Sequence, residues 1–267
     1  MRPLSIGIIG YGAIGHDLFQ AIEAGHAGSA VCPAVLVRRT RTDGTVPQAV
    51  ISDPDRFFAQ PFDAVIECAG HDGLRQHGDT VLCHGADLLV TSVGALTDDA
   101  LRIALIKTAE ANGKKLILPS AGIGALDMLS AAAVGGLTRV VVEVRKDPVS
   151  WKGTIAETMV DLDTLSSATV LYEGPVREGA RRYPANVNIS AAAAFAGLGL
   201  DQTALRIVAD PAITTHVVRL EAEGAFGKMQ FQEDVIPSDS NPKTGKIVAM
   251  ALIKTVRHMS SAFVVGA

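Results

Sequence analysis

Three glycines near the N-terminus, Gly10, Gly12 and Gly15, have the spacing G-x-G-x-x-G. They follow the apolar run LSIGIIG, which predicts a buried strand, and they open the helical pattern AIGHDLFQAIEAG. Here the first glycine permits a tight turn, the second lets the backbone approach a pyrophosphate, and the third lets the helix pack closely on the strand. We therefore expect a dinucleotide site that includes the free N–H groups of Ala13 and Ile14. The alternative is a glycine-rich turn without a ligand.

The residues after the second predicted strand bear on which dinucleotide binds. The strand AVLV at 34–37 is followed by Arg38, Arg39 and Arg41, and no acidic residue comes before Asp43. An acidic residue at this place binds the ribose 2′-OH of NAD, whereas an arginine accommodates the 2′-phosphate of NADP. We predict that the cofactor is NADP or NAD, with NADP preferred. A solvated strand edge is the alternative role for the arginines.

The composition argues against several classes of protein. The 267 residues are 48% apolar and 19% charged, the net charge is −4, and no basic block suggests nucleic acid as a partner. Three widely spaced cysteines without a CxxC pair argue against a disulfide framework or a metal site and for a reducing compartment. The apolar stretch ISAAAAFAGLGL has twelve residues, too few to cross a membrane. We read the N-terminal apolar run as a strand rather than a signal peptide, and expect a cytoplasmic protein with no membrane partner.

The first half of the chain must position the glycine loop. Up to Ser120, short β-branched runs alternate with helical patterns, which predicts an α/β fold with a Rossmann-type doubly wound parallel sheet. Within it we expect a helical link at QHGDTVLCHG. A further helix has Thr97 as its N-cap and ends at Gly113, and a strand follows at KLILPS.

After Ser120 the pattern changes. A small-residue helix at AGIGALDMLSAAAVGGL precedes longer strand patterns, which predict a second α+β domain with a mostly antiparallel sheet. The segment from NPKTGKIVAM onward is helical in pattern. We expect a dinucleotide-binding domain over 1–120, a catalytic and dimerisation domain over 121–241, and a C-terminal helix over 242–267 that packs back on the first domain.

Motifs along the whole chain are together more specific than the glycine loop alone. They are GYGAIG, ECAGHDGLRQHG, SVGAL, SAGIGALD, RKDPVSWKGT, YEGPVREGARRYPANVNIS, AGLGLD, ADP, EGAFG and NPKT. With these the chain resembles the L-aspartate dehydrogenases nearly from end to end. The resemblance implies reversible oxidation of L-aspartate by NAD(P)⁺ to iminosuccinate, which hydrolyses to oxaloacetate and ammonia. It also implies a homodimer, and a connection to pyridine nucleotide biosynthesis in some organisms.

The resemblance implies contacts for individual residues. The segment SAGIGALD lies beside the nicotinamide in that family, which makes Ala121 a cofactor contact, and the segment YPANVNIS does the same for Asn186, with Asn188 close to the substrate. N-capping of the following helix is an alternative or additional role for Asn186. In CAGHDG, after the third predicted strand, we expect Ala69 to contact the cofactor and His71 to face the substrate.

A dicarboxylic amino or imino acid needs cations or oriented donors to hold it. The candidate cations are Arg145, Lys146 and Lys152 in RKDPVSWKGT, and Lys243 in NPKT. Of these, Lys146 and Lys243 are the ones we expect to bind the substrate. A solvated surface charge is the alternative for each of them.

His216 is the expected proton-transfer residue, but it is displaced. The family has an Asn-x-His pattern, and counting from Asp210 puts the histidine at the position of Val218 and the asparagine at that of His216. Two residues along a strand keep the same face but shift the side chain by roughly 6.6 Å. Imidazole titrates in the range that amine and imine chemistry requires. The alternatives for His216 are a structural strand histidine, or a substrate contact in an enzyme whose preference has shifted from aspartate. The alternatives for the whole protein are a related imine or carbonyl reductase with another small dicarboxylic substrate, or a dinucleotide-binding protein without turnover.

Overall fold

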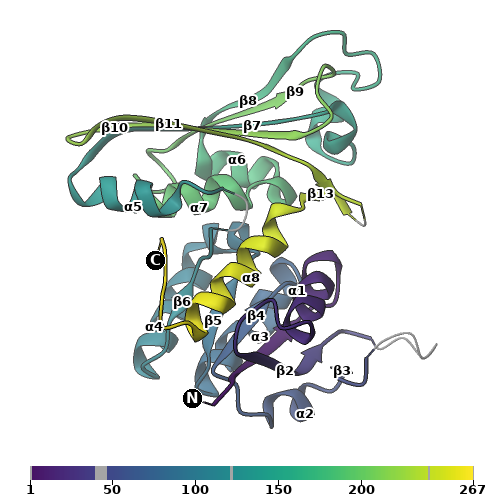
Figure 1. Cartoon of the computed structure of the whole chain (residues 1–267). Helices are drawn as coiled ribbons and strands as arrows, with labels where there is room; N and C mark the ends of the chain where they lie inside the picture. The colour runs from purple at the N-terminus through teal and green to yellow at the C-terminus, as the bar shows by residue number, and fades with distance from the viewer. Residues whose placement is uncertain (1, 40–46, 121–122, 240, 267) are drawn as a thin grey trace. The chain divides into compact units, whose positions relative to one another are not determined.

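The computed structural model of the chain describes residues 2–39, 47–120, 123–239 and 241–266. The chain divides into two compact units. Unit 1 comprises Met1–Ala121 together with Ala249–Ala267, and unit 2 comprises Gly122–Val248. Figure 1 shows the course of the chain through both units, which are described separately below.

Unit 1 is built on a parallel sheet of six strands in the order β3-β2-β1-β4-β5-β6. The strands are β1 (Leu4–Ile9), β2 (Ala30–Leu36), β3 (Val50–Ile51), β4 (Ala64–Glu67), β5 (Asp87–Val90) and β6 (Leu116–Ile117). Apolar side chains of β1 such as Ile6 and Ile8 are fully buried, as expected for a central strand covered on both faces. The strand order reverses between β1 and β4, which is where open α/β sheets bind ligands at the carboxyl ends of their strands.

The helices of unit 1 follow the strands. They are α1 (Ala13–Glu23), α2 (Pro54–Phe58), α3 (His71–Cys83), the 3-10 helix η1 (Val93–Thr97), α4 (Asp99–Ala111) and α8 (Ile247–Ser260). Leu252 and Val256 of α8 are fully buried in the same apolar core as Leu18 and Ile22 of α1. The C-terminal helix thus completes the core of the unit that contains the N-terminus.

Three details of unit 1 differ from the sequence expectations. The N-cap of α4 is Asp98, whose carboxylate accepts the N–H groups of Ala100 and Leu101, so Thr97 is not the cap. A carboxylate at a helix start also interacts favourably with the helix dipole, which explains the preference. Helix α3 begins at His71, ahead of the expected link at QHGDTVLCHG. The short β3 and α2 were not expected, although Asp53 and Pro54 form a recognised helix-start signal for α2.

Unit 2 contains a sheet of five strands in the order β11-β10-β7-β9-β8. The strands are β7 (Leu137–Lys146), β8 (Thr169–Pro175), β9 (Ala204–Ala209), β10 (His216–Gly224) and β11 (Gly227–Val235). All pairs are antiparallel except β7–β9. The second domain is therefore α+β with a mixed sheet.

The α-helices of unit 2 lie along one face of this sheet (Figure 1). They are α5 (Leu126–Val134), α6 (Val176–Arg182) and α7 (Asn188–Ala196). The unit also contains the 3-10 helices η2 (Pro148–Trp151), η3 (Ile155–Thr158) and η4 (Pro184–Asn186). Val140, Val142 and Val144 alternate along β7 and are buried. The residues between them point to the other face, where Glu143 accepts hydrogen bonds from Arg145, Arg206 and Arg219. We call these the helix-covered face and the charged face.

Helix α5 of unit 2 and the C-terminal helix both start later than expected. Helix α5 begins at Leu126 rather than within AGIG, because glycine is a poor helix former. Asn241–Gly245 is a strand, β13, paired with β12 (Pro237–Ser238), and the helix starts only at Ile247. The residue before a proline is driven toward extended backbone, so Pro242 disfavours the expected helical start.

Among the described residues, no helix is both long and apolar enough to span a membrane.

Candidate functional site

The glycine loop of unit 1 joins the end of β1 to the start of α1. Gly10 has φ of 101°, and a Cβ atom there would lie 2.6 Å from the carbonyl oxygen of Cys68. A Cβ on Gly15 would lie 2.0 Å from the carbonyl oxygen of Gly10. Gly12 is different, because a Cβ on it would meet no atom within 4 Å. The first and third glycines are therefore required for packing, while the space at the second is open to a ligand.

The N-terminus of α1 presents backbone donors at this open space. Gly12 is the exposed N-cap residue and supplies no side-chain cap, and no acidic residue lies in the first turn. The first N–H groups of a helix, here those of Ala13 and Ile14, have no acceptor within the helix and carry partial positive charge. This cradle fits the pyrophosphate of a dinucleotide, as the glycine spacing predicts.

A buried carboxylate fixes the neighbouring loop after β4. Glu67 is 1% exposed and accepts the N–H groups of Ala69 at 2.7 Å and Gly70 at 2.9 Å. It also accepts the N–H and the Oγ–H of Ser92, at 3.1 and 2.9 Å. Burial raises the pKa of Glu67, while the hydrogen bonds from Ser92 and Ala69 oppose that rise. Glu67 thereby holds Ala69 against the turn at Gly10.

Sequence reasoning missed Glu67, although an acidic residue that ends the apolar run DAVIE was the available signal. His71 follows this loop as the first residue of α3 and is half-buried.

Arg38 and Arg39 lie near the carboxyl end of β2, at the same end of the sheet as the glycine loop. They come shortly after Leu36, whose carbonyl oxygen accepts the N–H of Gly10 at 2.8 Å. Both side chains are exposed. Arg41, like Ala121 of the predicted nicotinamide contact, lies outside the described residues.

Unit 2 contains a buried cation at the end of β7. Lys146 is 5% exposed, and its Nζ donates to Oδ1 of Asn186 at 3.3 Å. The same Nζ lies 5.7 Å from the ring centre of Trp151, which is fully buried. Asn186 therefore accepts a hydrogen bond from a lysine and does not act as a helix cap, since α7 has Val187 at its N-cap position and no side-chain cap. Asn188 is the first residue of α7 and is half-buried.

His216 is the first residue of β10 and is 4% exposed. Val217 pairs with Arg145 of β7, so the next step of this antiparallel register sets His216 opposite Lys146. Directly opposite residues share a face of the sheet, here the helix-covered one. Val218, the position that the resemblance gives to a histidine, is 1% exposed and lies between Val144 and Glu233. The structure thus brings His216, Lys146 and Asn186 to one end of the sheet.

The other candidate cations have different surroundings. Arg145 points to the charged face, where it binds Asp210 at 2.7 Å as well as Glu143. Lys152 is exposed and forms an ion pair with Asp163. Lys243 lies in β13, and its side chain is outside the described part of the chain.

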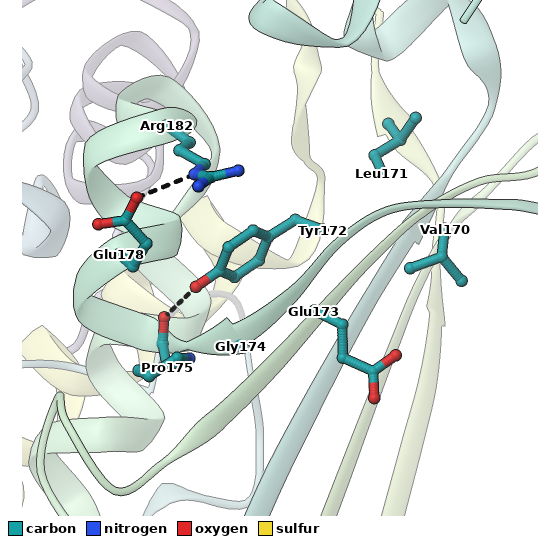
Figure 2. A pocket seen from close by; sticks show the side chains of 8 residues that line it. All are labelled: Val170, Leu171, Tyr172, Glu173, Gly174, Pro175, Glu178 and Arg182. Carbon is teal, nitrogen blue, oxygen red and sulfur yellow. Dashed lines mark hydrogen bonds and ion pairs between the residues drawn. The ribbon is translucent and has the colours of Figure 1, made fainter. Parts of the chain in front are cut away.

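A hollow of about 390 Å³ in unit 2 is not a convincing substrate site. Figure 2 shows its lining at β8 and α6. Tyr172 donates to the carbonyl oxygen of Pro175 at 2.7 Å, and Arg182 donates to Glu178 at 2.9 Å (Figure 2). Its main polar side chains already have partners, and none of the predicted site residues lines it.

Comparison with known proteins supplies the family. Residues 127–259 match the family model described as aspartate dehydrogenase, C-terminal, and residues 10–119 match the NAD binding domain of homoserine dehydrogenase. The chain is 38% identical to the L-aspartate dehydrogenase of Ruegeria pomeroyi, over 93% of this chain and 92% of that protein. The chain belongs to the aspartate dehydrogenase family. An L-aspartate dehydrogenase 2 of Bordetella pertussis is 35% identical, over 98% of both proteins.

Solved structures show that the fold is that of the aspartate dehydrogenase family. The crystal structure of aspartate dehydrogenase from Thermotoga maritima superposes with a TM-score of 0.78 at 23% identity, over 98% of this chain and 99% of that one. The expected doubly wound sheet with a second α+β domain is thus confirmed, as are the family and the dehydrogenase class. The match to an NAD-binding domain confirms NAD or NADP as the cofactor. The preference between the two stays a prediction.

Proposed function

We propose that this protein interconverts L-aspartate and iminosuccinate with NADP or NAD, and that the imine hydrolyses to oxaloacetate and ammonia. The observation that carries the proposal is the buried Lys146–Asn186 pair beside His216, in a chain that matches L-aspartate dehydrogenases over nearly its whole length. An ammonium, an amide and an imidazole are the groups needed to hold a carboxylate and to move a proton.

The glycine loop is the proposed site for the cofactor, which supplies the hydride acceptor of the oxidation. The N–H groups of Ala13 and Ile14 would donate to the pyrophosphate, and Gly12 leaves room for it. Exposed Arg38 and Arg39 favour the 2′-phosphate of NADP. Michaelis constants for NADPH and NADH, measured under the same conditions, check this preference.

Lys146 is the proposed partner of a substrate carboxylate, and Asn186 orients it. A cation held in the protein interior interacts strongly with a carboxylate, because little water screens the pair. Asn188, His71 and Lys243 stay candidates for contacts to the rest of the substrate. Lys146 selects a substrate that carries a carboxylate. Selection of a dicarboxylic amino acid would need a second cation or donor for the other carboxylate of the substrate.

His216 is the proposed proton-transfer residue, because an imidazole can both accept and donate a proton and His216 lies opposite Lys146. The buried Val218 in the place of the family histidine also favours a second candidate, a reductase for another small dicarboxylic acid. We infer in addition a homodimer with subunit contacts in unit 2, and a cytoplasmic location, which the three free thiols support.

Steady-state turnover tests the proposal. Oxaloacetate, ammonia and NADPH should give rapid oxidation of the nicotinamide, and L-aspartate should be the best substrate in a screen of amino acids. His216→Ala should lower turnover by about 10²- to 10⁴-fold. A clear preference for another amino or 2-oxo acid would support the second candidate. Tight NADPH binding without turnover of any acid would refute both.

A further inference from the structure

One carboxylate on the helix-covered face of unit 2 has not been assigned a role. Glu233 lies on β11, directly opposite Val218 of β10, while His216 lies opposite Val235. Glu233 and His216 are therefore diagonal neighbours on one face, a spacing that long side chains bridge. The face thus carries a carboxylate, an imidazole and, across β10, the ammonium of Lys146.

The surroundings of Glu233 are unusual for a carboxylate on an edge strand. Its Oε1 is buried and has no hydrogen-bond partner among the described residues. The carboxylate accepts the backbone N–H of Gly124, from the segment that leads into α5. That segment lies over β11, since a Cβ on Gly124 would lie 3.1 Å from the ring of Phe231. The carboxylate thus lies under the segment that leads into α5, with its Oε1 shielded from solvent.

The charge state of Glu233 follows from this environment. Burial raises its pKa to about 7, and the hydrogen bond from Gly124 opposes the rise. The titratable groups on the same face of the neighbouring strands are His216 and Lys146. Asp127 of α5 is exposed, and Glu221, Asp234 and Lys228 belong to the opposite face by strand alternation. Both protonation states are therefore populated at neutral pH, as a general base requires.

We propose that Glu233 is a second proton-transfer residue of the dehydrogenase reaction and accepts a proton from the substrate nitrogen. The proposal rests on the proposed function. In the oxidation, an N–H bond of the substrate ammonium breaks and its proton passes to the Glu233 carboxylate. The free amine then loses hydride from Cα to the cofactor, and the C–N bond becomes C=N with loss of the second proton. His216 remains available for that proton and for the addition of water to the imine.

Glu233→Gln is the test, because an amide keeps the shape and can still accept the N–H of Gly124 but cannot take up a proton. In the parent, kcat for L-aspartate oxidation should rise with pH through about 7, since the base acts when deprotonated. The variant should lose about 10²- to 10⁴-fold in kcat and also this limb of the pH profile. Asp234→Asn is the matched control, with the same loss of charge one residue away on the exposed side, and it should behave as the parent does.

A readout independent of turnover separates the two proposals. Infrared difference spectra should show a carboxyl group that titrates near neutral pH in the parent and in Asp234→Asn, and not in Glu233→Gln. Succinate added with NADP⁺ should raise the midpoint of that titration, because a second anion nearby disfavours the charged carboxylate. A parent without aspartate turnover would refute the proposed function alone. Unchanged kcat and pH profile in Glu233→Gln, or a midpoint unmoved by succinate, would refute the role of Glu233.

Discussion

At the end of β7, Lys146 holds an ammonium group in the interior of unit 2, where the oxygen of Asn186 accepts its hydrogen bond. Burying a charge is costly unless partners compensate for the lost water. A lysine that served only packing would be replaceable by an apolar residue at little cost. Its position across from His216 instead suits an anionic substrate whose nitrogen must exchange protons.

Lys146→Met therefore should weaken substrate use with little effect on the fold. A hydrogen bond to a charged group contributes about 1.5–3 kcal/mol, so kcat/KM for L-aspartate should fall by about 10- to 150-fold, mainly through KM. Steady-state kinetics measure this, and Lys228→Met, at an exposed lysine of the same unit, is the control. An unchanged KM for L-aspartate in Lys146→Met would contradict the assignment.

Individual site residues were predictable only in part. Lys146, Asn186 and His216 could be named from the sequence, but not their proximity. That proximity depends on the pairing of β7 with β10, which are about 70 residues apart in the chain. Glu67 and Glu233 were not singled out, because a single carboxylate in a strand pattern is usually a solvated residue. Only the hydrogen bonds and burial in the structure distinguish them.

At the scale of elements, the glycine loop was the best predicted part of the molecule. Each of its three positions requires glycine for a different steric reason, and the G-x-G-x-x-G spacing alone predicted this. The long strands of unit 2 were also predictable, because apolar and polar residues alternate along them. Most of the apolar residues lie on the helix-covered face and most of the polar residues lie on the charged face. The two-residue β3 and the five-residue α2 are too short to leave a periodic signal.

The loop allows a test that separates binding from folding. Gly12 has φ of −83°, which any residue adopts, and a Cβ there meets nothing within 4 Å. Gly12→Val should therefore keep the parent's melting temperature but bind NADPH at least tenfold more weakly, because its side chain fills the space of the pyrophosphate. Calorimetric titration and thermal unfolding measure the two effects. Gly15→Ala should instead destabilise the fold, owing to its collision with Gly10. NADPH binding by Gly12→Val at parental affinity would show that the cradle is not the site.

In the whole molecule, the proposed function gives each unit a separate part of the chemistry. Unit 1 would contribute the glycine loop, the Glu67-fixed loop and the two arginines. Unit 2 would contribute the buried Lys146, Asn186 and His216 and the half-buried Glu233. The sequence patterns predicted two domains, because a parallel βα alternation and a set of long strands require different folds. The identity of the substrate came from the resemblance and from the charges on unit 2, since a fold alone does not define an activity.

The central claim is that hydride leaves Cα of L-aspartate for a nicotinamide. The most direct measurement uses L-aspartate deuterated at Cα with NADP⁺, followed by mass spectrometry of the reduced cofactor. We expect one deuterium per molecule of NADPH formed, with oxaloacetate and ammonia as the other products. Reduced cofactor without the label, or no reduced NADP or NAD at all, would contradict it.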